Sequence, residues 1–473
     1  MSGPILFIAL PMVVAVVSYT LRAWRAAATL LVAGVSLALG LMLVLLPFGE
    51  PVTFLGQTFV LGGETSLLGR ALVLGPSTRM AMGFLFLVGA GFFLLAWQLE
   101  PQTLFAPVGL GMLGLLSGAL LIRPLVYAAL FLEIAVALSV FPLQADPRAP
   151  VRSGLRYLTF FVLALPGLLV SHWLLELYTL TPDQSGLLYM ATALIGFSFA
   201  LLLGLVPFHP WVPAVGRDGA PLMAAFLFTA VGGAVWFLLL TYLQAYPWLT
   251  DYPQWAAALT ALGVITAVMG GLLGTAQRGA GTLMGYAVMV DTGALLVALG
   301  ASSHTGLGLG VATLFARAWS LALMAAGLAG LRTQGWELTG LSWRAPWSAL
   351  AWVIGGLSLI GFPLTAGFAP RWGVYRLLFA TDPGAALALL LASTGLCVGL
   401  LRVFVQLMTR PAKPVGSGAE EQPAGATPHQ VEQPIVVILL IVFIVGTVVW
   451  GLFPQLWAGA AVQAGAAFPI FGP

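Results

Sequence analysis

Two apolar segments of membrane length, one in each half of the chain, are interrupted by prolines next to an ionisable side chain. The first break is the stretch Gly204–Pro213, which carries His209, and the second is Gly361–Trp372, which carries Arg371. In lipid, an interrupted helix persists only where protein or a water-filled cavity satisfies the freed backbone groups. Paired interruptions of this kind are typical of the ion or substrate path of a transporter. The prolines expected to break the helices are Pro207, Pro210, Pro363 and Pro370.

The composition places most of the chain in a lipid bilayer. Of the 473 residues, 60% are hydrophobic and 7% are charged, and a soluble protein of this size could not bury that much apolar surface. A span needs roughly 20 apolar residues, so the sequence predicts an all-α polytopic membrane protein with about fourteen transmembrane helices. The expected spans lie at about 4–21, 27–48, 78–97, 104–122, 124–141, 155–177, 185–206, 219–244, 255–274, 283–301, 306–330, 348–368, 384–408 and 433–453.

The distribution of basic residues predicts the orientation. The first span has no positive residue ahead of it and no cleavage pattern after it, so we expect it to be retained, with both termini on the outer, periplasmic side of a bacterial inner membrane. This orientation obeys the positive-inside rule. The cytoplasmic residues would be Arg22, Arg25, Arg148, Arg152, Arg156, Arg217, Arg278, Arg332, Arg344, Arg402, Arg410 and Lys413, and the outer ones Arg70, Arg79, Arg123, Arg371 and Arg376.

Three pairs of landmarks recur at nearly one offset, which predicts an internal repeat. The pairs are Glu133 and Asp291 (158 residues apart), Pro207 and Pro363 (156), and Gly204 and Gly361 (157). The offsets predict a first unit at 104–244 and a second at 255–408, each with five spans. An odd number of spans gives the two units opposite orientations, as in inverted-repeat transporters.

Three further segments complete the expected organisation. Residues 1–103 hold three spans and, at Val52–Gly63, β-branched and aromatic residues that predict an outer-face hairpin closed by a Gly-Gly turn. Residues 409–433 are rich in Pro, Gly, Glu and Ala and predict a disordered cytoplasmic loop. Residues 434–473 hold the last span and an apolar tail expected along the outer interface.

Carboxylates inside the spans are candidate functional residues, because a charge at mid-bilayer costs several kcal/mol unless it faces a cavity or a partner. Glu133 and Asp291 both lie mid-span. Each is interpreted as a proton site, the alternative being a neutral carboxyl that is hydrogen-bonded to a neighbouring helix.

Four basic side chains accompany them. His209 titrates near neutral pH and suits a proton relay, or else it donates to carbonyls freed by the break. Arg371 cannot release a proton; it holds a carboxylate charged, or it extends to the outer interface. Arg317 lies inside a span and is expected to pair with Asp291, the nearest carboxylate in span order. Arg156 begins its span, where an interfacial role is the alternative to a role in a proton path.

The rest of the sequence excludes several kinds of chemistry. The one lysine, Lys413, lies outside the spans, so no lysine can serve an intramembrane proton path, and the one cysteine, Cys397, excludes an internal disulfide or cysteine-ligated cluster. The net charge of +3 is too small and dispersed to predict nucleic acid as a partner. No phosphate-binding loop, metal-ligand spacing or activated nucleophile is present. We therefore expect no catalytic residue, no metal site and no cofactor bound by this chain.

The stretch Gly204–Pro213, followed by Gly219-Ala220-Pro221, resembles the VPFHxWLP…GAP signature of the antiporter-like membrane subunits of respiratory complex I. This superfamily also includes Mrp sodium/proton antiporters and energy-converting hydrogenases. The second broken helix of the family resembles the stretch from Leu341–Trp347 through Gly367–Phe368. The glutamate that the family has in its fifth span resembles Glu133. The length is most similar to the chain N type. The resemblance implies fourteen spans in two inverted five-helix units, with a half-channel in each and a polar axis joining them at mid-membrane.

The chain departs from the family pattern at its basic residues. The family carries lysines before the first break and after the GAP motif, and this chain has Leu202 and Gly233 at the matching positions. The family lysine of the twelfth span is matched by Arg371, and a polar residue of the tenth span is matched by Asp291. Either Arg156 or His209 then substitutes as the cation near Glu133, or the chain has lost pumping and is a structural piece.

These observations lead us to expect a membrane-arm subunit of a complex I-type NADH:quinone oxidoreductase that takes part in proton translocation and performs no redox chemistry itself. Its partners would be other membrane-arm subunits, lipids, and quinone-binding and NADH-oxidising subunits elsewhere in the assembly. The alternatives are a non-pumping structural subunit, or a subunit of a cation/proton antiporter or membrane-bound hydrogenase. The expected proton pathway is Glu133, Arg156, His209, Asp291, Arg317 and Arg371.

Overall fold

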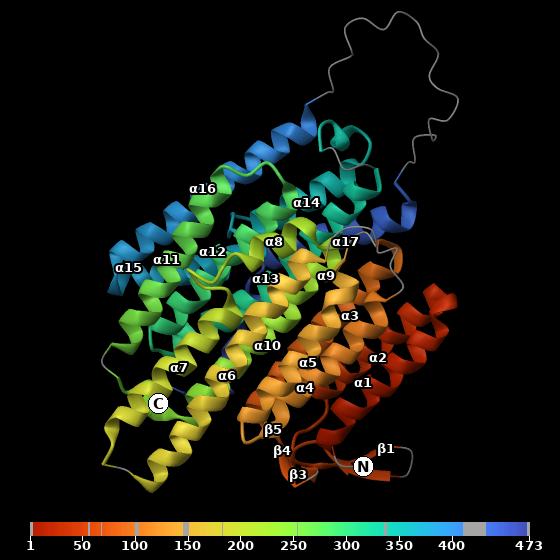
Figure 1. The fold of residues 1–473 in the computed structure, drawn as a ribbon. Helices are drawn as coiled ribbons and strands as arrows, with labels where there is room; N and C mark the ends of the chain where they lie inside the picture. The colour runs from red at the N-terminus through yellow and green to blue at the C-terminus, as the bar shows by residue number, and fades with distance from the viewer. Residues whose placement is uncertain are drawn as a thin grey trace, which may run out of the picture.

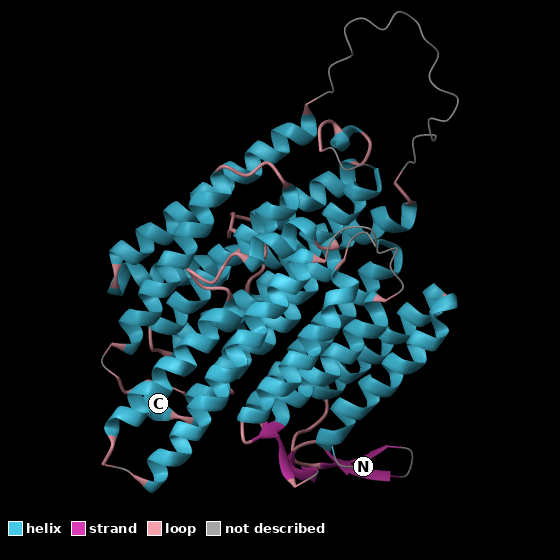
Figure 2. Ribbon diagram, viewed as in Figure 1, coloured by secondary structure: helices cyan, strands magenta, loops and turns pink. Residues whose placement is uncertain are grey.

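The computed structural model describes residues 3–54, 57–67, 69–99, 104–144, 151–181, 183–252, 254–334, 338–409 and 432–470. They form a helical bundle with a few strands at one end (Figures 1 and 2). The helices are α1 (Gly3–Thr20), α2 (Arg25–Leu45), α3 (Pro76–Leu99), α4 (Phe105–Leu121), α5 (Val126–Leu143), α6 (Arg152–Leu180), α7 (Ser185–Leu203), α8 (Trp211–Asp218), α9 (Pro221–Phe226), α10 (Gly232–Ala245), α11 (Trp255–Thr275), α12 (Ala280–Gly300), α13 (His304–Gln334), α14 (Pro346–Leu359), α15 (Phe368–Thr381), α16 (Pro383–Met408), α17 (Pro434–Leu452) and α18 (Gln455–Ala466). Short 3-10 turns occupy Leu21–Ala23, Pro247–Leu249 and Leu341–Trp343, and the π-helical turn Leu227–Val231 joins α9 to α10.

The prediction of a polytopic all-α membrane protein is confirmed. Among the described residues, twelve helices are long and apolar enough to cross a membrane, and two shorter apolar helices are α4 and α14. Each expected span overlaps one of these helices, because each is a predominantly apolar run bounded by polar residues, Gly or Pro. The number of crossings, the inverted units 104–244 and 255–408, and the orientation of the termini stay predictions.

Two expected spans end early, at glycines with left-handed backbone. The span predicted at 348–368 contains only α14 and the break after it, because α14 ends at Leu359 and α15 begins only at Phe368. Gly361 has a φ of +79°, a conformation that costs glycine little and ends a helix. Gly204, with a φ of +65°, ends α7 in the same way.

A hairpin is present where the sequence predicts one, but the expected turn is wrong; its place on the outer face stays a prediction. β1 (Pro51–Phe54) pairs antiparallel with β2 (Gln57–Val60), so both strands of this hairpin precede the two glycines, which do not close it. The Gly62-Gly63 pair instead leads into a second hairpin, because both residues have positive φ and redirect the chain. In it, β3 (Gly63–Leu67) pairs with β4 (Arg70–Leu74), and β5 (Ile122–Arg123) pairs with β4.

Burial separates central helices from peripheral ones. Most residues of α12, of α13 and of the span containing α9–α10 are buried, whereas most residues of α1 and α17 are not. α13 contacts α3, α9, α12, α14, α15, α17 and α18, which makes it the central helix (Figure 1). The peripheral helices expose large apolar side chains, a surface suited to lipid or to other subunits.

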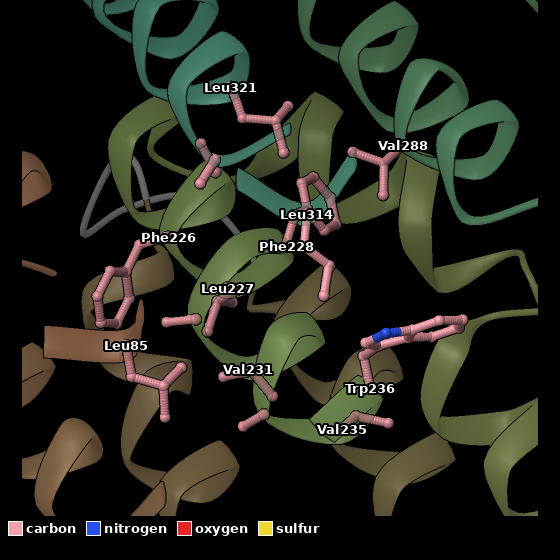
Figure 3. Packing of buried hydrophobic residues seen from close by; sticks show 14 of the residues in the cluster. Leu85, Phe226, Leu227, Phe228, Val231, Val235, Trp236, Val288, Leu314 and Leu321 are labelled. Carbon is pink, nitrogen blue, oxygen red and sulfur yellow. The ribbon is translucent and has the colours of Figure 1, made fainter. Parts of the chain in front are cut away.

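The core around α9 is dense and aromatic. Phe226 makes edge-on ring contacts with Phe92 of α3 and Phe105 of α4, at centroid distances of 5.8 and 5.6 Å. Figure 3 shows Phe226 beside Leu85, with Trp236 further along the same span. This packing fixes α9 and the π-helical turn against the N-terminal helices.

The last two helices are tied to the centre of the bundle. Trp319 of α13 donates from Nε1 to Thr447 Oγ1 of α17 at 3.0 Å, and α18, the expected interfacial tail, contacts α13.

The Glu432 carboxylate accepts hydrogen bonds from the Ser348 backbone N–H (2.9 Å) and hydroxyl (2.6 Å), which caps the N-terminus of α14. Most of the predicted 409–433 loop, residues 410–431, lies outside the described residues.

Candidate functional site

The first break, between α7 and α8, is stabilised by one hydrogen bond within the span and one to a neighbouring helix. Gly204 ends α7, and the Leu205 N–H donates to the Ala200 carbonyl at 2.9 Å. The Val206 N–H donates to the hydroxyl of Thr266 on α11 at 3.3 Å. A neighbouring helix thus satisfies one of the groups freed by the break, as burial in lipid demands.

The second break, between α14 and α15, repeats this helix ending. Gly361 ends the helix, and the next residue, Phe362, donates to the Leu357 carbonyl at 3.0 Å, the same five-residue spacing as in the first break. The Ser358 hydroxyl accepts from Gly367 N–H at 3.2 Å and from the Ser320 hydroxyl at 2.7 Å. The matching geometry agrees with the offset between the two sequence motifs.

The predicted helix-breaking prolines occupy different positions. Pro207 and Pro363 lie in the two breaks, and Pro210 directly precedes α8. Pro370 is not in a break: it is the third residue of α15, because the first turn of a helix tolerates a residue without an N–H donor. The break at 361–367 is therefore shorter than the stretch 361–372 suggests.

A carboxylate and two guanidinium groups meet beside the second break. Arg371 of α15 donates from Nη2 to Asp291 Oδ1 of α12 at 2.8 Å and to the Leu359 carbonyl at 3.1 Å. Arg317 of α13 places Nη1 3.8 Å from Asp291 Oδ2 and donates from it to the hydroxyl of Thr292 at 3.1 Å. Asp291, Arg317 and Arg371 are 2%, 6% and 2% exposed. We call these three residues the charge cluster.

The charge cluster decides two of the alternatives left open by the sequence. The predicted ion pair between Arg317 and Asp291 is present. The placement of Arg371 at the outer interface is wrong, because its side chain is buried and its Nη2 contacts Asp291 at 2.8 Å. A buried arginine is paired in this way because removal of its partner would leave an uncompensated charge in a low-dielectric interior.

The candidate residues of the first unit do not assemble in the same way. Glu133 of α5 is half-buried, and it forms no ion pair within 4.0 Å in the described part of the chain. Arg156 is exposed near the start of α6, in line with the interfacial alternative. His209 is half-buried at the first break, and its Nδ1 has no hydrogen-bond partner among the described residues. Neither basic residue therefore pairs with Glu133.

The positions that match the family lysines are filled differently. Leu202 is buried, and a side chain at Gly233 would collide with the ring of Phe84, because a Cβ there would lie 2.7 Å from it. Arg317 reaches the neighbouring position instead: its Nη2 lies 3.6 Å from where a Cβ would stand on Gly232. A cation from α13 thus occupies the space beside the π-helical turn.

Sequence reasoning missed a group of buried aromatic side chains next to the charge cluster. Tyr157 on α6, Trp211 on α8 and Trp236 on α10 line a small cavity together with Thr292 and Arg317. Nothing in the sequence distinguishes these aromatics from ordinary core residues, because each stands in an apolar run. Only the tertiary arrangement brings these side chains to one cavity.

Comparisons with known proteins agree with this architecture. The family model described as NADH:quinone oxidoreductase/Mrp antiporter, transmembrane, matches residues 153–397. The chain is 29% identical over 333 residues to NADH-quinone oxidoreductase subunit N of Cereibacter sphaeroides, covering 67% of this chain and 73% of that protein. It is 27% identical over 378 residues to subunit N of Methylococcus capsulatus, covering 73% of each.

Solved structures share the fold over nearly the whole chain. A chain of the Mrp complex from Dietzia sp. superposes with a TM-score of 0.80 at 18% identity, covering 100% of this chain and 98% of that one. A chain of respiratory complex I from Thermus thermophilus with bound NADH superposes with a TM-score of 0.75 at 19% identity, covering 99% and 100%.

Proposed function

Because the chain belongs to the NADH:quinone oxidoreductase/Mrp antiporter transmembrane family, we propose that it is a membrane-arm subunit of a complex I-type NADH:quinone oxidoreductase that takes part in proton translocation coupled to quinone reduction. The subunit N relatives support the type of assembly. The chain performs no redox chemistry in this proposal. NADH oxidation and quinone reduction belong to partner subunits, and no cofactor is held by this chain.

The observation that carries the proposal is the buried carboxylate of Asp291 between two arginines at a helix break. Arginine stays protonated, so Asp291 is the member of the charge cluster that can exchange a proton. A change in the charge of Asp291 alters its electrostatic attraction to both arginines. Because Arg371 also binds the Leu359 carbonyl, this change is transmitted to the backbone of the break. The mechanism is therefore electrostatic, with protons loaded and released through the half-channels of the two units.

The peripheral helices supply the surfaces for partners. Large apolar side chains are exposed on α1 and α17, for example Val13 (60%) and Ile438 (60%). Lipids and other membrane-arm subunits would cover them in the inner membrane of a bacterial cell. Co-purification of the tagged chain with NADH-oxidising subunits separates this assembly from an antiporter or a hydrogenase.

A non-pumping structural subunit is the second candidate, and the first unit favours it. Glu133 has no ion pair in the described part of the chain, and neither Leu202 nor Gly233 can carry charge. If this candidate is correct, the carboxylates can be neutralised without any loss of proton translocation.

The test measures proton pumping by the intact complex in membrane vesicles with Asp291→Asn. We expect a partial loss of pumping per assembled complex, since related subunits would pump in parallel. The matched control is Asp218→Asn, which neutralises an exposed aspartate that pairs with its neighbour Arg217 at 2.7 Å. Glu133→Gln tests in the same way whether the carboxylate of the predicted first unit takes part in pumping. Unchanged pumping in both Asp291→Asn and Glu133→Gln would favour the structural candidate.

A further inference from the structure

The second break presents apolar side chains at the surface of the chain. Phe362 is 47% exposed, Leu364 is 60% exposed, and Pro363 between them is exposed as well. We call these three residues the exposed turn. The rest of the break, residues 365–367, is buried. In the first break the large apolar side chains, such as Phe208, are buried or half-buried.

The exposed turn lies near the middle of the bundle's length. Just before it, the Leu359 carbonyl accepts from Arg371, which contacts Asp291 at the centre of α12. On its inner side, the Ser358 hydroxyl accepts from that of Ser320, near the centre of α13. Both α12 and α13 are long and apolar enough to cross a membrane. We therefore place the turn at the depth of the hydrocarbon region.

Part of the backbone of the exposed turn has no hydrogen-bond partner. The Phe362 N–H donates to the Leu357 carbonyl at 3.0 Å, and the Phe362 carbonyl accepts from the Thr365 hydroxyl at 2.6 Å. The Leu364 N–H and the carbonyls of Pro363 and Leu364 form no hydrogen bond with the described residues. Non-helical backbone at membrane depth is stable only where protein buries it or where it lines a water-filled cavity.

The side chains of the turn decide between these two surroundings. A site that holds water needs several polar partners for it, whereas the exposed side chains here belong to phenylalanine, proline and leucine. Within the chain, α17 covers the turn from one side only, because Gly451 packs against the backbone of Leu364 while the Leu364 side chain stays exposed. The remaining cover is therefore expected to be protein from outside this chain.

The conformation of Leu364 supports a role for its side chain outside the chain. Its φ is +67°, and only Ser302 shares a positive φ among the described residues other than glycine. A glycine would adopt this conformation without strain, but it would present no side chain. Strained residues of this kind cluster at functional sites. The packing of this chain does not explain the leucine, because most of its side chain touches nothing here.

We propose that the exposed turn is a docking site for an apolar transmembrane helix of a neighbouring membrane-arm subunit. Phe362 and Leu364 would pack against that helix, which would shield the backbone of the break from lipid. The inference rests on the proposed function in one respect, because it requires that the chain be assembled with other membrane subunits. It assigns a surface and a partner, and it holds whether or not the charge cluster moves protons.

Photo-cross-linking in native membranes tests the identity of the partner. The photo-reactive amino acid p-benzoyl-phenylalanine replaces Phe362 in the full chain, and the adducts are identified by mass spectrometry. We expect an adduct with a transmembrane peptide of another subunit. The same probe in place of Trp352, which is buried in α14, is the control and should give no such adduct. Adducts of position 362 with lipid alone, or with a second copy of this chain, would overturn the proposal.

A failure of the proposed function has a different appearance in this experiment. If the chain belongs to another kind of assembly, NADH-oxidising subunits do not co-purify with it, whatever position 362 reaches. If only the docking site is wrong, those subunits co-purify and position 362 still gives no adduct with a neighbouring subunit.

A matched pair of variants tests the leucine itself. Leu364→Gly removes the side chain and relieves the left-handed strain, so the Tm of the purified full chain should stay near that of the wild type. Association with the neighbouring subunits should weaken about tenfold, as is typical for truncation of a central interface side chain. The control Leu391→Ala truncates a leucine that is 62% exposed on the regular helix α16, and it should change neither readout. Wild-type association in Leu364→Gly, or an equal loss in both variants, would contradict the docking site.

Discussion

At the scale of single residues, the two arginines of the charge cluster contribute unequally. Arg371 contacts Asp291 at 2.8 Å and Arg317 stands 3.8 Å away. Loss of one partner of a buried ion pair costs about 3–5 kcal/mol, so Arg371→Gln should lower the free energy of unfolding by that amount. Arg317→Gln should cost less, about 1–3 kcal/mol, the range for a lost buried hydrogen bond. Denaturation in detergent, followed by circular dichroism, measures both.

The arginine prediction has a control on the same helix. Arg376 is exposed on α15, and Arg376→Gln should change stability by less than about 0.5 kcal/mol. The double variant Arg371→Gln/Asp291→Asn should lose less stability than the sum of the single variants, because the two residues are in contact. Additive losses would mean that the pair is not coupled.

At the scale of elements, each broken span depends on a glycine that no other residue replaces without strain. Gly361 has a φ of +79°, and a Cβ on it would lie 2.6 Å from the Arg371 side chain. Gly361→Ala should therefore cost the strain of a left-handed alanine, about 1–3 kcal/mol, plus the displacement of Arg371. Thermal unfolding of the purified protein measures the sum.

A glycine outside the breaks separates the two contributions. Gly49 has a φ of +82°, but a Cβ on it would have nothing within 4 Å, so Gly49→Ala reports the backbone strain alone. The excess loss in Gly361→Ala is the steric part. If the two alanine variants lose the same stability, the close packing of the break against Arg371 is refuted.

At the scale of the whole molecule, the strands and the end of α16 lie at opposite ends of the bundle (Figure 1). With Cys397 replaced by serine, the chain has no cysteine, so single cysteines can report sidedness. The positive-inside rule predicts that Ser66→Cys on β3 reacts with a membrane-impermeant maleimide from the periplasmic side. Thr409→Cys, at the end of α16, should react only after the membrane is opened. The reverse pattern would invert the predicted orientation.

The sequence was sufficient for the apolar helices and for part of the site, but not for the β3–β4 hairpin. Long apolar runs and the cost of a buried charge located the spans, the breaks and the pairing of Arg317 with Asp291. The sequence could not show that Arg371 is buried, because the depth of its side chain in the bundle depends on the residue at which α15 begins after the break. It could not single out Tyr157 or Trp236, whose apolar surroundings resemble any core position.

One close approach gives the last long helix an influence beyond its own span. At Gly451 of α17, an added Cβ would lie 2.5 Å from backbone atoms of Leu364 and Thr365, in the unwound turn between α14 and α15. The opposite face of α17 exposes Val442 and Val445. A neighbouring subunit that contacts that face and displaces α17 would therefore also displace the backbone of the turn. Contacts formed on assembly would thus alter the break between α14 and α15 through the close approach at Gly451.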